Sequence, residues 1–121
     1  MYSIRLAVLL FGLGFVGSPS ASSELALGQS LAQTNACMAC HQIDQKRVGP
    51  AFRVVAEKLA GQEGAEAYLA NAIIQGSRGR WGAVPMPAQR QVSAANARLI
   101  AAWILTLDEA VPHEAQTKEG S

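Results

Sequence analysis

A strong charge of one sign is absent from this 121-residue sequence, whose formal net charge is +1. Arg5 lies in an N-terminal segment that we expect to be removed, and the remaining chain then has nine lysines and arginines against nine aspartates and glutamates. Domains that bind nucleic acid usually carry a strongly basic face. The balanced charge therefore argues against a nucleic-acid partner.

Histidine, cysteine and aromatic residues are also scarce. The chain has two histidines and two cysteines, and 6% of its residues are aromatic against 50% hydrophobic, so its core is mostly aliphatic. A structural zinc site needs four ligands, and the chain offers only Cys37, Cys40, His41 and the distant His113. No Ser-His-Asp set, phosphate loop or pair of catalytic carboxylates is visible, and we expect the protein not to be an enzyme.

Long apolar runs are missing as well. Residues 1–22 have the pattern of a secretory signal peptide: Arg5 is the positive charge, Leu6 to Val16 the apolar core, and Ser18 to Ser23 the small residues near a cleavage site. The apolar core is too short to span a bilayer comfortably. We therefore expect export without stable membrane insertion, with an uncleaved anchor as the alternative. One small domain is expected at residues 23–109, followed by a mobile polar tail at 110–121.

Cys37-Met38-Ala39-Cys40-His41 is the motif that says most about function. Two thiols at this spacing, with a histidine directly after the second, are typical of a c-type haem held by two thioether bonds above a histidine ligand. A buried porphyrin would also supply the large flat apolar body that the few aromatic residues leave missing. A thioredoxin-like pair would need a βαβ setting, and no strand pattern is convincing. A disulfide between the cysteines remains the alternative, but it gives the histidine no role.

The hydrophobic pattern predicts an all-α domain of four to five short helices around one covalent haem. Helices are expected at about 24–35, from Gly49-Pro50 to Gly61, from Glu63 or Gly64 to Gly76, and from Ser93 to Leu107 or Asp108. The expected core positions are Leu27, Gly28, Leu31, Ala32, Phe52, Val55, Ala56, Leu59, Leu69, Ala72, Ile73, Ile100, Trp103, Ile104 and Leu107. Gly28 favours a close helix crossing, because glycine otherwise weakens a helix by about 1 kcal/mol. Segment 77–92 has no period and is a long irregular loop, of a kind that is usually functional or disordered.

A haem bound through His41 leaves one axial position of the iron for a second ligand. Met38 lies inside the attachment motif, too near the histidine side to reach the opposite face, whereas Met86 lies in the irregular loop between two prolines. The prolines restrict the backbone, so the thioether can be presented at little entropic cost. We therefore expect His41 and Met86 to be the axial ligands. His113 is the competing ligand, and a methionine that only fills a gap in a turn is the other alternative.

As a whole, the chain resembles a short bacterial class I cytochrome c, of the periplasmic kind that donates electrons to nitrite reductases and terminal oxidases. The matching stretches are Cys37 to His41, Val48 to Phe52, Ala60 to Ala67, Gly76-Ser77, Trp81-Gly82, Pro85 to Pro87 and Ala102 to Leu105. The resemblance implies an all-α fold in which the first and last helices cross and the haem is enclosed except at one edge. It also implies that the Pro50 carbonyl accepts a hydrogen bond from His41 Nδ1 and that Trp81 donates its indole N–H to a haem propionate.

Two places depart from the pattern of this family. Ala72 stands where relatives often carry an arginine that reaches a propionate, and Arg80 is the candidate to replace it. Relatives also often have an asparagine near the ligand methionine. Here Gln89 or Gln91 stands nearby, with one extra residue before the last helix, so the sequence does not assign a hydrogen-bond donor to the methionine sulfur.

These features predict a soluble, monomeric periplasmic protein that carries single electrons on one covalent haem c. An iron with two protein ligands has no open site for oxygen or peroxide. The alternatives are a haem-based sensor or peroxidase-like enzyme, if Met86 is labile, and a fixed electron-transfer subunit of a dehydrogenase complex. The expected partners are a redox donor and acceptor, with a nitrite reductase, a terminal oxidase or a bc-type complex as candidates.

Charge placement predicts how such partners dock. Cations follow the haem motif and bracket Met86, while acids gather toward the C-terminus; they are Lys46, Arg47, Arg53, Arg78, Arg80 and Arg90, and Asp108, Glu109, Glu114 and Glu119. Cations that surround the haem edge would steer the protein toward acidic partners. An ordinary solvated surface is the alternative.

Overall fold

The computed structural model describes residues 14 and 17–108 of the chain. The elements are, in order, α1 (Ala21–Thr34), the 3₁₀ turn η1 (Cys37–Ala39), α2 (Phe52–Leu59), α3 (Ala65–Gln75), α4 (Ala94–Leu105) and the 3₁₀ turn η2 (Thr106–Asp108). The described residues form no strand beyond one isolated antiparallel bridge, between Ser77 and Met86. The expected all-α class is confirmed. The expected tail at 110–121, with His113, and most of the expected signal peptide lie outside the described residues.

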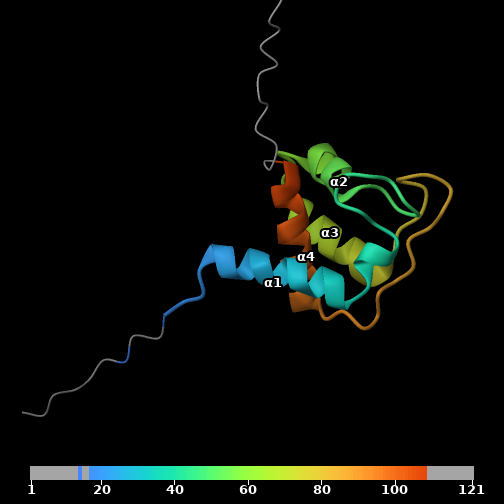
Figure 1. Cartoon of the computed structure of the whole chain (residues 1–121). Helices are drawn as coiled ribbons and strands as arrows, with labels where there is room; N and C mark the ends of the chain where they lie inside the picture. Colours follow the sequence, from blue (N-terminus) through green and yellow to red (C-terminus); the bar gives the residue numbers. More distant parts are fainter. Residues whose placement is uncertain (1–13, 15–16, 109–121) are drawn as a thin grey trace, which may run out of the picture.

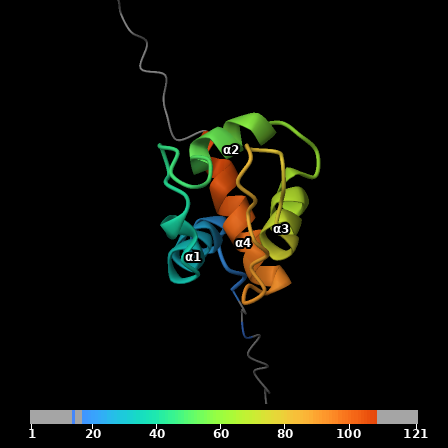
Figure 2. The same ribbon diagram turned by 90° about the vertical axis from the view of Figure 1, so that its right-hand side faces the viewer.

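Helix α4 is the centre of the fold. Helices α1, α2 and α3 all contact it, and Figure 2 shows α4 between α1 and α3, with α2 across one end. The two irregular segments, residues 36–51 and 76–93, both lie on the right-hand side of this helical frame in Figure 1. Two loops that are distant in sequence therefore border the same side of the core.

Gly28 lets α1 cross α4 closely. A Cβ built on Gly28 would lie 2.8 Å from the carbonyl carbon of Leu99 and 2.9 Å from Trp103 Cβ. These neighbours are backbone or directly attached to it, so a side chain at this position would push the two helices apart. The close crossing expected from Gly28 is confirmed.

Helix α1 differs from the expectation in two respects. It begins at Ala21, three residues before its expected start, and so includes the last two residues of segment 1–22. Its buried stripe runs along Leu25, Gly28 and Ala32, which lie at i, i+3 and i+7. The expected burial of Leu27 is wrong, since this side chain is 48% exposed. Leu27 projects outside the sector of α1 that meets α4.

The other helices follow the hydrophobic pattern closely. Ser93 caps α4 as expected, because its hydroxyl accepts a hydrogen bond of 3.1 Å from the Asn96 backbone N–H. Ala72, expected in the core, is only half-buried. The buried residues of the three helices are Phe52, Val55, Ala56 and Leu59 in α2, Leu69, Ala70 and Ile73 in α3, and Ala97, Ile100, Ala101, Trp103 and Ile104 in α4. None of the described helices combines the length and apolar character that crossing a membrane requires.

Candidate haem site

A cavity of about 660 Å³ opens between the two irregular segments and the helical core. Every site residue expected from the sequence lines it, namely Cys37, Cys40, His41, Pro50, Arg80, Trp81 and Met86. Its inner wall is apolar and comes from α2, α3 and α4, through Phe52, Val55, Leu69, Ile73, Ile100 and Ile104. None of the described residues that line it is an aspartate or a glutamate. An apolar cavity bordered by two thiols, an imidazole and a thioether fits a porphyrin that is held covalently and ligated at its iron.

The attachment motif forms one wall of the cavity. Ala36 has a φ of 59°, the left-handed conformation that turns the chain out of α1, and η1 follows directly. The His41 backbone N–H donates to the Cys37 carbonyl at 3.0 Å, which brings both cysteines and the histidine to one side. The two thiols are not bonded to each other. Burial raises the pKa of the Cys37 thiol, and the nearby Cys40 adds to this rise, whereas a backbone hydrogen bond opposes it.

His41 is buried and held in one orientation. Its Nδ1 lies 2.8 Å from the Pro50 carbonyl oxygen, and because a carbonyl can only accept, Nδ1 carries the proton and Nε2 keeps a free lone pair. The Phe52 ring stacks on the imidazole, with 4.7 Å between ring centroids. A Cβ built on Gly49 would lie 2.8 Å from Nδ1 and 3.0 Å from Nε2. The sequence marks Gly49 only as a chain break, whereas the structure shows that its missing side chain makes room for the imidazole.

Met86 reaches the same cavity from the other loop, and its main chain is fixed by hydrogen bonds. Its N–H donates to the Ser77 carbonyl at 2.9 Å, and the Ser77 N–H donates to the Met86 carbonyl at 3.0 Å. Gly76 ends α3 with a φ of 77°, and a Cβ there would lie 2.6 Å from the Met86 carbonyl oxygen. From the sequence, only the flanking prolines were expected to position Met86. The structure adds the bridge to Ser77 and the close approach of the Met86 backbone to Gly76.

The two glutamines near Met86 hydrogen-bond within their own loop. Gln89 Nε2 donates to the Pro87 carbonyl at 2.9 Å, and Gln91 Nε2 donates to Gln89 Oε1 at 3.0 Å. Both side chains border the cavity. Among the described residues, no hydrogen bond to the Met86 sulfur is formed, and the sequence had left that donor unassigned.

Arg80 and Trp81 stand at the cavity edge, each against a different helix. The guanidinium carbon of Arg80 lies 4.5 Å from the centroid of the Tyr68 ring on α3. The ammonium nitrogen of Lys58, on α2, lies 4.5 Å from the centroid of the Trp81 ring. The role of Tyr68 and Lys58 was not visible in the sequence, because cation–π pairs between separate elements have no fixed spacing.

The cations differ in what they do. All five of these exposed side chains carry a positive charge, but only Lys46, Arg47 and Arg80 line the cavity, whereas Arg78 and Arg90 do not.

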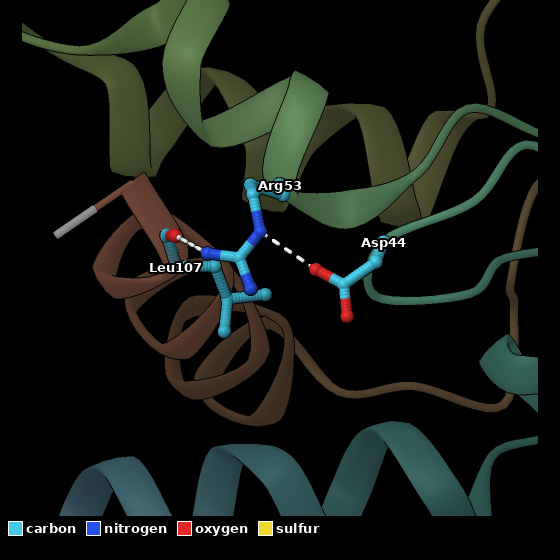
Figure 3. A network of polar contacts seen from close by, with 3 residues as sticks. All are labelled: Asp44, Arg53 and Leu107. Carbon is cyan, nitrogen blue, oxygen red and sulfur yellow. Dashed lines mark hydrogen bonds and ion pairs between the residues drawn. The ribbon is translucent and has the colours of Figure 1, made fainter. Parts of the chain in front are cut away.

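Arg53 departs from the expected docking role. Its Nε donates to Asp44 Oδ1 at 2.7 Å, and a terminal guanidinium nitrogen donates to the Leu107 carbonyl at 2.6 Å, as Figure 3 shows. This arginine ties the loop after the haem motif to η2, the turn that directly follows α4, so it is not a free charge at the cavity. Of the four acids expected at the far end, only Asp108 lies within the described residues.

Comparison with known proteins agrees with this geometry. Residues 25–108 match the family model described as cytochrome c. The chain belongs to the cytochrome c family.

Proteins similar to this chain include small bacterial cytochromes. The chain is 45% identical over 98 residues to cytochrome c-552 of Nitrosomonas europaea, covering 77% of this chain and 95% of that protein. It is 51% identical over 76 residues to cytochrome c-551 of Pseudomonas aeruginosa, covering 63% and 72% of the two chains. The crystal structure of wild-type Nitrosomonas europaea cytochrome c552 matches with a TM-score of 0.64 at 49% identity, over 65% of this chain and 98% of that one.

Membership of the family confirms the resemblance, the fold and the cofactor. Cytochromes c-551 and c-552 are class I electron carriers with a covalent haem, and histidine–methionine ligation is typical of the family. This chain is therefore an electron carrier with one haem c and its iron. Electron carriers of this kind are generally not enzymes.

Proposed function

We propose that this cytochrome is a periplasmic one-electron carrier in which Cys37 and Cys40 bind the haem and His41 and Met86 ligate its iron. The observation that carries the proposal is the meeting of these four side chains, from two loops distant in sequence, around one apolar cavity. Residues 1–22, with the pattern of a signal peptide, support export to the periplasm.

The chain's own residues prepare both ligand positions. The Pro50 carbonyl holds the proton of His41 on Nδ1 and leaves Nε2 for the metal. The bridge to Ser77 fixes the backbone that carries Met86. When bound, the haem supplies an iron that alternates between its ferric and ferrous states. A neutral thioether favours the ferrous state relative to a second imidazole.

The cavity lining favours a carrier over a peroxidase-like enzyme. Peroxide chemistry needs an open axial position and an acid–base group close to it. The described lining holds no carboxylate, and its histidine is engaged with Pro50. We therefore propose that the protein has no enzymatic activity of its own.

The mouth of the cavity is suited to docking an acidic redox protein. Val48 and Val84, from the two loops, are 52% and 64% exposed and border the cavity. Lys46, Arg47 and Arg80 border the same cavity without any carboxylate among the described lining residues. We name these three cations the basic rim. An acidic patch with an apolar centre would complement it, and a nitrite reductase, a terminal oxidase or a bc-type complex are the candidate partners. We expect the protein to meet them as a monomer.

The absorption spectrum of the mature holoprotein tests the ligand assignment. The ferric form should show the weak red band that arises from sulfur-to-iron ligation. Met86→Ala should remove this band while the haem stays covalently attached. Met38→Ala is the matched control, since Met38 also packs against the core but lies within the attachment motif and does not line the cavity. A band that survives Met86→Ala, or is absent from the wild type, would refute ligation by Met86. The protein would then be better explained as a haem-based sensor or a peroxidase-like enzyme.

A further inference from the structure

Two consecutive residues of the Met86 loop are each held by a side chain from a different helix. Arg80 lies over the Tyr68 ring of α3, and Trp81 lies under the Lys58 ammonium group of α2, both at 4.5 Å from ring centroid to cation. Gly79, just before them, has a φ of 71° and turns the chain into this position. The loop is thereby fastened where it passes the cavity edge.

Arg80 is held differently from the other two cations of the basic rim. Lys46 and Arg47 lie on the opposite loop, and the structure gives their side chains no hydrogen bond, ion pair or aromatic contact within residues 17–108. A long charged side chain without such contacts samples many rotamers and is screened by water. The guanidinium of Arg80 has a flat face on which an aromatic ring can stack, so the Tyr68 ring restricts it to one region.

Helix α3 contacts the Arg80 guanidinium through Tyr68 but contributes no cation of its own to this wall of the cavity. Tyr68 and Ala72 are one turn apart, and both line the cavity. The small Ala72 brings no charge to this wall. Its neighbour Tyr68 instead reaches the loop and fixes the charge that Arg80 brings.

We propose that Tyr68 is a positioning residue whose ring holds the Arg80 guanidinium at the cavity edge, where its charge raises the reduction potential of the haem. The proposal rests on the haem site proposed above. Reduction adds one negative charge at the iron, so a fixed cation beside an apolar cavity stabilises the reduced form. Arginine, unlike lysine, has a planar guanidinium whose positive charge is permanent. The charge therefore acts constantly, and its effect depends on how it is held.

Redox titration of the holoprotein and its variants tests this role. Arg80→Met should lower the equilibrium constant for reduction about threefold, which is about 28 mV at 59 mV per tenfold change. Tyr68→Leu should lower it about twofold, whereas Tyr68→Phe should leave it unchanged because the ring remains. The double variant Tyr68→Leu/Arg80→Met should match Arg80→Met alone. Arg78→Met is the control, since Arg78 is an exposed arginine of the same loop that does not line the cavity, and it should change the constant less than Arg80→Met.

The outcomes separate this proposal from the assignment of the ligands. An unchanged potential in Tyr68→Leu, or additive effects of the two substitutions, would overturn the positioning role while the red band shows intact ligation. The proposal would also be overturned if Arg80→Met lowered the equilibrium constant for reduction no more than Arg78→Met does. If Tyr68→Leu does not accumulate, Arg80→Lys replaces it, because lysine keeps the charge but not the flat stacking group. A potential below wild type supports the role of the stack, and a wild-type potential refutes it.

Discussion

Replacing Gly49 with alanine should destabilise the protein, because the added Cβ would press on the His41 imidazole. The new Cβ would lie 2.8 Å from Nδ1 and 3.0 Å from Nε2, and the imidazole cannot yield easily, because it stacks on Phe52 and is bonded to Pro50. Alanine restricts the unfolded chain, which stabilises the fold by about 0.4–1 kcal/mol. Overpacking costs about 1–3 kcal/mol, and losing the hydrogen bond costs about 0.5–1.5 kcal/mol. The costs win, and we expect a net loss of about 2 kcal/mol.

Thermal unfolding of the ferric holoprotein, followed by haem absorption, measures this loss. A domain of this size loses about 4–8 °C in Tm for each kcal/mol, so Gly49→Ala should lower the Tm by about 8–16 °C. Val48→Ala is the matched control, because Val48 is the preceding residue and is 52% exposed. It should change stability by no more than about 0.5 kcal/mol. An unchanged Tm in Gly49→Ala, or an equal drop in Val48→Ala, would show that the imidazole does not depend on this glycine.

Three further predictions concern the crossing of α1 and α4, the contacts of Arg53, and docking through the basic rim. Gly28→Ala should lower the Tm, although alanine improves helix propensity by about 1 kcal/mol, because its Cβ would press on α4; a higher Tm would contradict the close crossing. In urea unfolding, Arg53→Met should lower the free energy of unfolding by about 1–2 kcal/mol and Asp44→Asn by less than about 1 kcal/mol. Arg53 also donates to the Leu107 carbonyl, whereas Asp44 is largely exposed. Equal losses would show that the hydrogen bond to Leu107 adds no stability. Electron transfer to an acidic redox protein, measured by stopped flow, should slow as salt rises, and Lys46→Gln should reduce this dependence; a rate that is constant or rises with salt would reject docking through the basic rim.

Hydrophobic periodicity predicted α2 and α4 well because each of these helices buries a broad stripe. The expected core residues of α2 are all buried, and α4 buries Ile100, Trp103 and Ile104. Periodicity was less reliable for α1, where Leu27 shares a face with Leu31 on a helical wheel but lies outside the contact. The burial of α1 is decided by where Gly28 meets α4. That contact joins residues far apart in sequence, so the pattern within α1 could not locate it.

Charge was the feature that the sequence described least well. From the sequence, Arg53 was expected to be a free cation beside the haem motif. In the structure it donates hydrogen bonds to Asp44 and to the carbonyl of Leu107, which lies 54 positions further along the chain. Lys58 and Tyr68 read as ordinary helix residues, yet both hold the Met86 loop. A charged side chain reaches across several ångströms, so its partner depends on the tertiary fold and not on local spacing.

The two expected iron ligands are supported by the same physical device. The His41 ring packs against Gly49 and is hydrogen-bonded to the main-chain carbonyl of Pro50. The Met86 backbone packs against Gly76 and is hydrogen-bonded to the main chain of Ser77. In each case a missing Cβ lets the ligand segment approach, and a backbone group fixes it. Side chains that line the cavity, such as Tyr68, can then change without moving the ligands. This separation explains how substitutions at the rim could tune the potential and the partner while the iron keeps its ligands, and it predicts that the red band survives Tyr68→Leu.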